Sequence, residues 1–182
     1  MDSTSDNAIM LKVKAGDLDK LALLFERYNR PLFGFFYRSC GQAESSEDLV
    51  QNVFMRMLKY RHTFTGEGKF TTWMYHLARN VLADHYKKQK KLGYSDDFAQ
   101  VENMNDYTDT QHQQQEENLV LLRKAIGQLS PDKQEVLVMS RYQGLKYKEI
   151  AEILQCTEAN VKVRVYRAVQ ELRKIYLQLE QL

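Results

Sequence analysis

The sequence predicts an all-α protein made of two small helical domains. Its 182 residues include only two prolines and eight glycines, so few positions interrupt a helix. Leu, Lys, Gln, Glu and Arg, which favour helices, fill the long stretches between them. Apolar residues make up 43% of the chain, enough to bury a hydrophobic core, and they recur at helical spacing.

In the first half of the chain, apolar spacing predicts helices over Ile9 to Tyr28, Leu32 to Tyr37, Leu49 to Tyr60 and Phe70 to Tyr86. Pro31 is expected to open the second of these helices, because proline fits the first helical turn. The segment from His62 to Phe70 holds two glycines and lacks helical periodicity. This composition predicts a loop before the fourth helix.

The second half shows clear helix boundaries. Ser130 followed by Pro131 predicts an N-cap and a first helical residue, and Gly144 lies just past the expected end of that helix. Two further helices are predicted, over about Tyr147 to Leu154 and Glu158 to Leu179.

Charge divides the chain into three parts. Residues 1–92 carry a net +5, residues 93–117 carry −7, and residues 118–182 carry +4. The middle part is rich in Gln, Asn and Asp and poor in aliphatic residues, so it is predicted to be a flexible linker. Two basic domains suggest a polyanionic partner, although charges of this size also fit an ordinary solvated surface.

The sequence shows no pattern typical of an enzyme or a metal site. Cys40 and Cys156 lack ligands at metal-binding spacing, and His76 and His85 fall on opposite helix faces. We therefore expect no catalytic residue, no metal and no cofactor. The N-terminus lacks a basic segment followed by an apolar one, and no apolar run reaches about 18 residues. A cytoplasmic protein without direct membrane insertion is expected.

The last two helices form a helix-turn-helix pattern. Apolar residues of the first helix share one face, a short break follows at residues 155–157, and Val161, Val165, Ala168 and Leu172 define the core face of the second. Lys146 and Gln155 stand where a Ser or Asp cap and a Gly are more usual, which is expected to cost some stability.

The opposite face of this second helix predicts DNA recognition. It carries Val163 and Tyr166, flanked by Lys162 and Arg167, and apolar groups beside cations suit thymine methyls and guanine edges. The alternative is a helix that binds a protein partner or is purely structural. Arg164 lies nearer the core edge, where a phosphate contact and an intraprotein salt bridge are both compatible with the pattern.

The helix from Phe70 onward carries a second informative face. Phe70, Met74, Leu77, Ala78 and Val81 are expected to point inward, with Trp73 and Tyr75 at the margins. Aromatic rings beside Lys and Arg suit unpaired nucleic acid, although Trp73 also fits an ordinary core and the Lys-rich end a solvated one. The residues expected outward are Thr72, His76, Arg79, Asn80, Ala83, Tyr86, Lys87 and Lys90.

These motifs together resemble the bacterial sigma-70 family, in its two-domain form, the extracytoplasmic function (ECF) sigma factors. The segments LFERYNRPLFGFFYRSCGQAESSEDLVQNVFMRML and FTTWMYHLARNVLADHYKK resemble sigma domain 2, and LSPDKQEVLVMSRYQGLKYKEIAEILQCTEANVKVRVYRAVQELRK resembles sigma domain 4. The resemblance implies domain 2 over residues 1–92, an acidic linker over 93–117 and domain 4 over 118–182. It also implies core RNA polymerase and promoter DNA as partners, and an anti-sigma factor in many relatives.

The resemblance further assigns roles to residues. Polymerase binding falls on Asp48, Leu49, Gln51 and Asn52, although core packing is favoured for Leu49. Asn52 stands where the family usually has Glu. The loop from Thr63 to Lys69 is expected to hold a base flipped out of the minus-ten element, with glycines that let the backbone approach it closely. The minus-ten candidates are Phe64, Thr65, Gly66, Lys69, Trp73, His76, Arg79, Asn80 and Lys87. The minus-thirty-five candidates are Asn160, Lys162, Val163, Arg164, Tyr166 and Arg167.

Two other functions each fit part of the sequence. A stand-alone helix-turn-helix regulator would explain residues 119–182 but gives no purpose to the face that starts at Trp73 or to the glycine loop. A nucleic-acid enzyme needs a fixed acidic cluster, and Asp96, Asp97 and Asp106 lie in the predicted linker, where ligand geometry is not held. A promoter-specificity subunit of RNA polymerase accounts for the whole chain.

Overall fold

Helices make up every regular element in residues 5–92 and 110–181, the parts of the chain that the computed structural model describes; side chains of residues 110–117 lie outside this description. The predicted all-α fold is confirmed. The N-terminal elements are α1 (Asp6–Lys14), η1 (Leu18–Lys20), α2 (Leu21–Cys40), α3 (Ala43–Lys59), η2 (Arg61–Thr63) and α4 (Phe70–Lys91). The C-terminal elements are α5 (Thr110–Gly127), α6 (Pro131–Leu137), the π-helical turn η3 (Val138–Tyr142), α7 (Tyr147–Leu154) and α8 (Glu158–Glu180).

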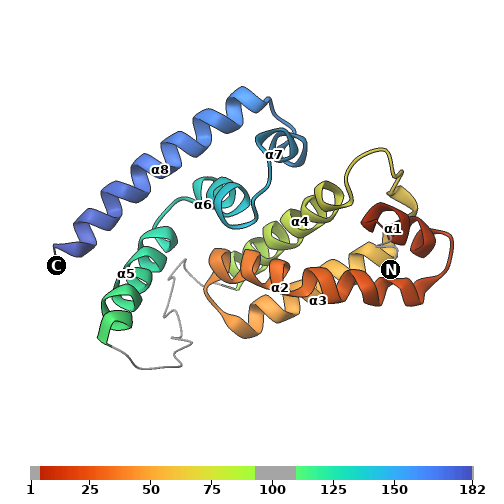
Figure 1. Cartoon of the computed structure of the whole chain (residues 1–182), viewed down its shortest axis with the longest axis horizontal. Coiled ribbons are helices and arrows are strands. Elements are labelled where there is room, and N and C mark those ends of the chain that lie inside the picture. The colour runs from red at the N-terminus through yellow and green to blue at the C-terminus, as the bar shows by residue number, and fades with distance from the viewer. Residues whose placement is uncertain (1–4, 93–109, 182) are drawn as a thin grey trace.

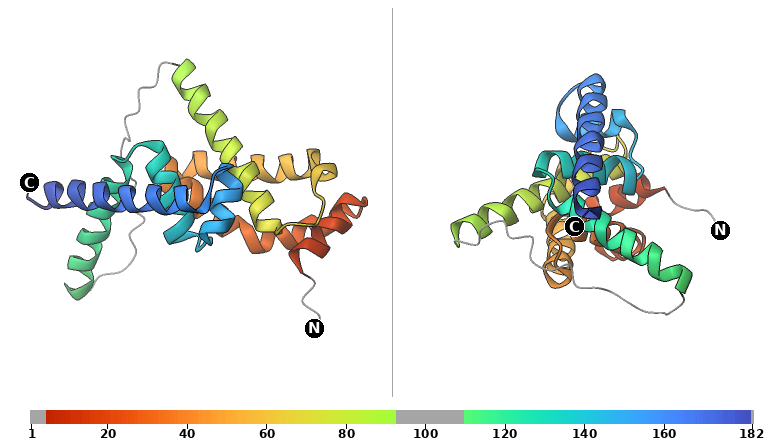
Figure 2. Two further views of the ribbon diagram at one scale, coloured as in Figure 1. Left: turned by 90° about the horizontal axis from the view of Figure 1, so that it is seen from above. Right: turned by 90° about the vertical axis from the view of Figure 1, so that its left-hand side faces the viewer.

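The two groups of helices lie beside each other along the long axis of the molecule (Figure 1). Helices α1 to α4 form the N-terminal group, in which α3 packs between α2 and α4. Helices α5 to α8 form the C-terminal group, and the long α8 runs along the molecule against α5, α6 and α7 (Figure 2). The groups meet where α7 packs on α4 and where η3 and α6 pack on α2.

The predicted first helix is divided in two, which corrects the expected Ile9 to Tyr28 span. Gly16 adopts a positive φ of 111°, a conformation that costs glycine little and ends α1. The chain then passes through η1 before α2 begins at Leu21. Helical periodicity alone did not reveal the break, because apolar residues keep helical spacing on both sides of it.

The expectation that Pro31 opens a helix is wrong, because α2 continues through it from Leu21 to Cys40. Proline removes one hydrogen-bond donor from a helix interior. Leu24 lies before Pro31 and Leu32 and Phe35 after it, and all three are completely buried. Burial of one continuous apolar stripe therefore favours a single helix despite the lost bond.

Other boundaries agree more closely. Helix α6 starts at Pro131 after Ser130, Gly144 lies past η3 with a φ of 63°, and α7 has the predicted bounds. Helix α3 starts earlier than expected, at Ala43, and α4 extends further, to Lys91. Helix α5 starts at Thr110, inside the predicted linker, whereas residues 93–109, with Asp96, Asp97 and Asp106, lie outside the described residues.

The buried side chains of the two groups join in one hydrophobic cluster. Large residues such as Phe35, Phe36, Met57 and Phe70 fill the space between α2, α3 and α4. In the C-terminal group, α6 to α8 bury Val136, Met139, Ile150, Ile153, Val161, Val165 and Ala168. The inward faces predicted for α4 and α8 are thus confirmed, except that Leu172 is only partly buried.

Candidate nucleic-acid interface

Helices α7 and α8 form the predicted helix-turn-helix. Thr157 caps α8, because its side-chain oxygen accepts a hydrogen bond from the Asn160 amide at 3.2 Å. Gln155 ends α7 with a φ of 52°, the left-handed conformation in which a glycine is more usual. Helix α7 begins without a Ser or Asp cap, and the Glu149 carboxylate compensates by accepting from the Lys146 amide at 2.7 Å.

The predicted outward face of α8 is exposed. Val163 and Tyr166 are 48% and 66% exposed, although both are apolar or aromatic. The side chains of Asn160, Lys162, Arg164 and Arg167 are exposed as well. Lys162 lies 3.5 Å from Glu158 one turn earlier, an exposed pair that leaves the ammonium available. This face has the mixed apolar and cationic character that fits a DNA groove.

The glycine loop before α4 borders a cavity of about 320 Å³. Thr63, Phe64, Thr65, Gly68, Lys69, Thr72, Trp73 and His76 line it from the N-terminal group. The Thr72 hydroxyl is buried, and within residues 5–92 and 110–181 it has no hydrogen-bond partner. A partly open cavity lined by aromatic rings, a lysine and a histidine suits a planar polar group such as a nucleobase.

Trp73 is held at the edge of this cavity. Its ring packs 5.3 Å from the Phe64 ring, and its indole N–H donates to the Thr63 hydroxyl at 3.3 Å. Trp73 therefore fits in part both the predicted core position and the predicted nucleic-acid contact, because its side chain is half-buried and also borders the cavity. Phe64, a predicted DNA contact, is itself 3% exposed and packs against Phe70, so its role is to support the cavity wall.

Two tyrosines of α4 differ from expectation. Tyr75, placed at the margin of the helix, is buried, and its hydroxyl donates to Gln143 in the C-terminal group at 2.6 Å. Tyr86, expected to point outward, is half-buried, and its hydroxyl donates to the Ser39 carbonyl at 2.6 Å. Tyrosine fits such positions because its ring is apolar and its tip finds a polar partner.

The remaining candidates on α4 lie on its partly exposed side. His76 and Asn80 are half-buried neighbours with 3.4 Å between His76 Nδ1 and Asn80 Nδ2, and Lys87 is exposed near the end of the helix. Thr65 is exposed on the loop, while Gly66 adopts a φ of 82°. His76 borders the cavity beside Trp73, so the loop and the first turns of α4 form one continuous surface.

The C-terminal group covers part of this surface. Glu152 and Ile153 of α7 complete the lining of the 320 Å³ cavity. Lys69 pairs with Glu149 at 2.6 Å, and Arg79 Nε lies 3.0 Å from the Glu135 carboxylate. Two cations predicted to contact DNA, Lys69 and Arg79, are therefore paired with acids of the C-terminal group. Helical periodicity could not predict these pairs, because their partners lie far apart in the sequence.

The π-helical turn η3 supplies further contacts between the groups. Gln143 follows this turn and binds Tyr75 of α4, and its amide donates to the Pro31 carbonyl of α2 at 3.2 Å. The Arg38 guanidinium lies 4.3 Å from the centre of the Tyr142 ring. Single π turns recur at functional sites, and here the wider turn places two side chains against α2 and α4.

The two acids at this contact differ in their electrostatics. Burial raises the pKa of Glu135, although Arg79 and Arg164 partly offset it. The charge of Arg164 therefore stabilises the ionised Glu135 carboxylate, although the Arg164 side chain is exposed. Burial also raises the pKa of Glu149, but hydrogen bonds from Lys69 and the Lys146 amide outweigh it and leave that pKa below its ordinary value.

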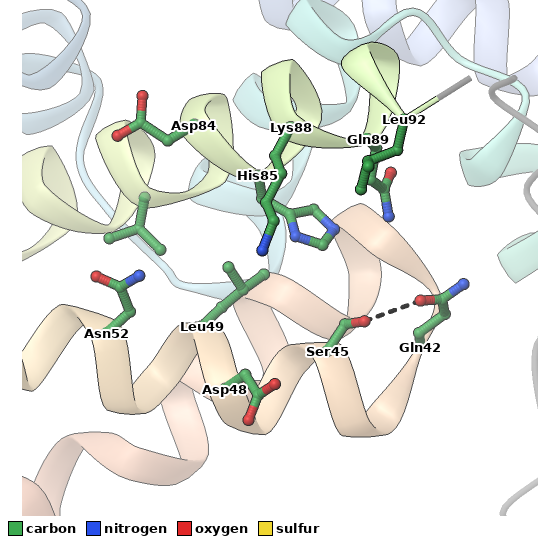
Figure 3. A pocket seen from close by; sticks show the side chains of 11 residues that line it. Gln42, Ser45, Asp48, Leu49, Asn52, Asp84, His85, Lys88, Gln89 and Leu92 are labelled. Carbon is green, nitrogen blue, oxygen red and sulfur yellow. Dashed lines mark hydrogen bonds between the residues drawn. The ribbon is translucent and has the colours of Figure 1, made fainter. Parts of the chain in front are cut away.

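The expected polymerase-binding residues lie on α3, where Asp48, Leu49 and Asn52 line a groove of about 660 Å³ between α3 and α4. Gln51 instead lines a separate cavity between α2 and α3. Asp48, Gln51 and Asn52 are exposed, whereas Leu49 is 6% exposed, as core packing predicts, and only borders the groove. Figure 3 shows Leu49 and Asn52 on the side of α3 toward α4, with Leu49 opposite His85 and Lys88, whereas the Asp48 carboxylate lies on the side of α3 away from α4. Burial lowers the pKa of His85, which favours its neutral form.

No group of His, Cys, Asp and Glu side chains in the described parts of the chain is arranged to hold a metal ion. Within the same residues, no helix combines the length and the apolar character needed to cross a lipid bilayer.

Comparison with known proteins identifies both halves of the chain. The sigma-70 region 2 family matches residues 24–92, and the sigma-70 region 4 family matches residues 119–172. The ECF RNA polymerase sigma factor SigW of Bacillus subtilis is 30% identical to this chain, and the match covers 90% of this chain and 92% of SigW. The ECF sigma factor BldN of Streptomyces coelicolor is also 30% identical, over 94% of this chain and 67% of BldN.

Solved structures show the same fold. CnrH, determined in complex with the cytosolic domain of CnrY, has a TM-score of 0.70 at 19% identity and matches 93% of this chain and 96% of CnrH. The sigma factor RpoE of Bartonella quintana, determined with the anti-sigma factor NepR, has a TM-score of 0.64 at 22% identity over 85% of this chain and 95% of RpoE. The matched families, the relatives and the helix-turn-helix geometry agree: the chain belongs to the sigma-70 family, as an ECF RNA polymerase sigma factor.

Proposed function

We propose that this chain binds core RNA polymerase through the exposed face of α3 and selects promoters through two separate DNA-binding surfaces. The observation that carries the proposal is the pair of surfaces itself: the cavity at the glycine loop and the exposed face of α8. A stand-alone regulator needs only the second surface. The proposed domains are residues 1–92 and 118–182, joined by the acidic linker, and the chain works in the cytoplasm without catalysing a reaction.

The polymerase contact is assigned to Asp48, Gln51 and Asn52. All three side chains are exposed on α3. Asn52 also accepts a hydrogen bond from Arg56 at 3.1 Å, and Arg56 in turn pairs with Asp84 of α4 at 2.8 Å. This network orients the amide of Asn52, which stands where the family usually has a Glu, and favours a contact based on hydrogen bonds.

The minus-ten contact is assigned to the loop and the start of α4. Thr65, Lys69 and His76 are placed to contact the backbone and edge of a base in the cavity, and Trp73 to stack against the DNA fork. Asn80 is assigned to the duplex just upstream. Flipping a base costs a few kcal/mol of stacking and pairing, which cavity contacts must recover.

The proposed DNA contact requires the C-terminal group to move. Glu152 and Ile153 occupy one side of the cavity, Glu149 pairs with Lys69 of its lining, and Glu135 pairs with Arg79 further along α4. Carboxylates beside phosphates are repulsive, so DNA entry is coupled to displacement of α7. RpoE was determined with the anti-sigma factor NepR, and CnrH with the cytosolic domain of CnrY. An anti-sigma partner for this chain is part of the proposal.

The first experiment is competition binding. Fluorescently labelled chain is titrated into bacterial core RNA polymerase, with unlabelled principal sigma factor as competitor. Tight binding that the competitor reverses is expected if both proteins share a site. Absence of binding by folded protein, together with specific binding to duplex DNA on its own, would favour the stand-alone regulator.

A further inference from the structure

One side of α1 faces the glycine loop rather than the helical core. Asn7, Leu11 and Lys14 lie at spacings of four and three residues, so they share one face of the helix. Ile9, Met10 and Val13, on another face, are buried against the core. Helix α1 therefore has two packing faces, and the second one contacts the segment that leads into α4.

Asn7 makes three hydrogen bonds to this segment. Its Nδ2 donates to the Gly66 carbonyl at 3.1 Å and to the Gly68 carbonyl at 2.7 Å. Its Oδ1 accepts from the Phe70 amide at 2.8 Å. Only a side-chain amide supplies two donors and an acceptor on one planar group, and reversing it would set oxygen against two carbonyl oxygens.

The third of these bonds caps α4 from a distant part of the chain. Lys69 occupies the N-cap position of α4 and makes no side-chain capping bond. The first amides of a helix lack partners within the helix, so each needs one from elsewhere. Asn7 accepts the hydrogen bond of the Phe70 amide, and this bond fixes the start of α4 relative to α1.

Two neighbours complete the contact. Lys14 Nζ donates to the Phe64 carbonyl at 2.7 Å. A Cβ atom added to Gly66, whose φ is 82°, would lie 3.2 Å from Leu11 Cδ1, so only glycine fits there without a shift. Alternate carbonyls of the loop, at residues 64, 66 and 68, are thus bound to α1.

Helix α1 is itself anchored to α2. Asp6 accepts from Arg27 at 2.6 Å and from the Tyr28 hydroxyl at 2.5 Å. The loop therefore rests on a support that is tied to the core on one side and to the loop backbone on the other. Its opposite side carries Thr65, Gly68 and Lys69 along the cavity.

We propose that Asn7 is a positioning residue for promoter selection, because it holds the backbone of the glycine loop in the shape that receives a minus-ten base. This inference rests on the proposed function. Helix α1, which binds the backbone carbonyls of Phe64 and Gly68 in the cavity lining, is then a determinant of minus-ten preference.

The test is a selection with the full chain bound to bacterial core RNA polymerase. A DNA library randomised over the minus-ten element is incubated with holoenzyme, and complexes that resist heparin are sequenced. The variant Asn7→Asp keeps the size of the side chain but loses both donors. We expect the ratio of binding to the best minus-ten sequence over binding to its single-base variants to fall about fivefold or more, which is the scale of one base contact. The affinity for core RNA polymerase is expected to stay unchanged.

The control is Ser5→Ala, which removes the N-cap of α1, where Ser5 accepts from the Ala8 amide at 3.3 Å, and leaves the loop contacts in place. It is expected to lower the melting temperature and to keep the parental preferences. If Asn7→Asp fails to fold, Lys14→Met tests the same loop through the Phe64 carbonyl. If Asn7→Asp folds and prefers the same minus-ten sequences as the parent protein, the inference about Asn7 is wrong but the proposed function stands. If the parent protein itself shows no sequence preference, both the inference and the proposed function are wrong.

Discussion

Arg79 and Glu135 join the two halves of this sigma factor through an ion pair of 3.0 Å between α4 and α6. The Glu135 side chain is largely buried in the contact, while that of Arg79 is partly exposed. Removing one partner from a buried pair leaves an uncompensated charge, which costs more than the intact pair contributes. The contact is thus a sensitive point for the arrangement of the two groups.

Charge reversal at this contact is expected to separate the groups. Glu135→Lys places a second cation beside Arg79, and the like charges repel in a partly buried site. Small-angle X-ray scattering is expected to show a larger radius of gyration than in the parent. Glu180→Lys, the same charge change at the exposed end of α8, is the control and is expected to leave it unchanged.

The double variant Arg79→Glu with Glu135→Lys restores opposite charges. It is expected to return the radius of gyration toward the parental value. An equally expanded double variant would show that the other contacts between the groups, such as Tyr75 with Gln143, do not re-form around the reversed pair.

A neutral replacement of Glu135 is expected to behave differently. Burial raises the pKa of Glu135 in the folded protein above its ordinary value of 4.5, so the folded state favours the protonated, neutral carboxyl. This contribution to stability is complete below about pH 4.5 and is lost as the pH rises through the folded pKa. Glu135→Gln stays neutral throughout. Its free energy of unfolding relative to the parent is therefore expected to increase from about pH 4.5 to about pH 7.5.

Urea denaturation across this range measures the effect. A difference that stays constant with pH would mean that the Arg79 attraction balances the burial of Glu135. A difference that decreases toward pH 7.5 would mean that the attraction outweighs it.

Gln155 is a site where a single change is expected to stabilise the protein. A non-glycine residue in the left-handed conformation costs about 1 to 2 kcal/mol, and Gln155 has a φ of 52°. Gln155→Gly is expected to raise the free energy of unfolding by roughly 1 kcal/mol, since part of the gain is offset by the greater freedom of glycine in the unfolded chain. Chemical denaturation of both proteins checks this, with Gln170→Gly, in the interior of α8, expected to destabilise.

The roles of Lys162 and Arg167 are separable by salt. If either side chain contacts a base edge, its alanine variant is expected to lose about 1 to 3 kcal/mol of discrimination at one promoter position. If it contacts only phosphate, binding is expected to weaken alike on all sequences and the salt slope to fall by about one. Holoenzyme binding to matched and mismatched minus-thirty-five elements, titrated with salt, distinguishes the two.

The bounds of α7 and the faces of α8 followed from the sequence because both depend on local signals. Three to four residues per turn set which side chains of α8 are buried, and the exposed Val163 and Tyr166 follow directly from that period. The inward face of α4 was predictable for the same reason. The resemblance to the sigma-70 family then connected these local patterns to promoter recognition.

Tertiary packing decided the rest. Whether Pro31 starts a helix or lies within one depends on the buried stripe that α3 and α4 offer to α2, which no local signal contains. Asn7 meets residues about sixty positions away, and Glu135 meets an arginine of the other group. By itself the sequence determined where the helices lie and which faces are apolar, because these follow from short-range periodicity. Only the tertiary structure decided which polar groups meet, because such pairs form between segments that packing of the apolar faces brings together.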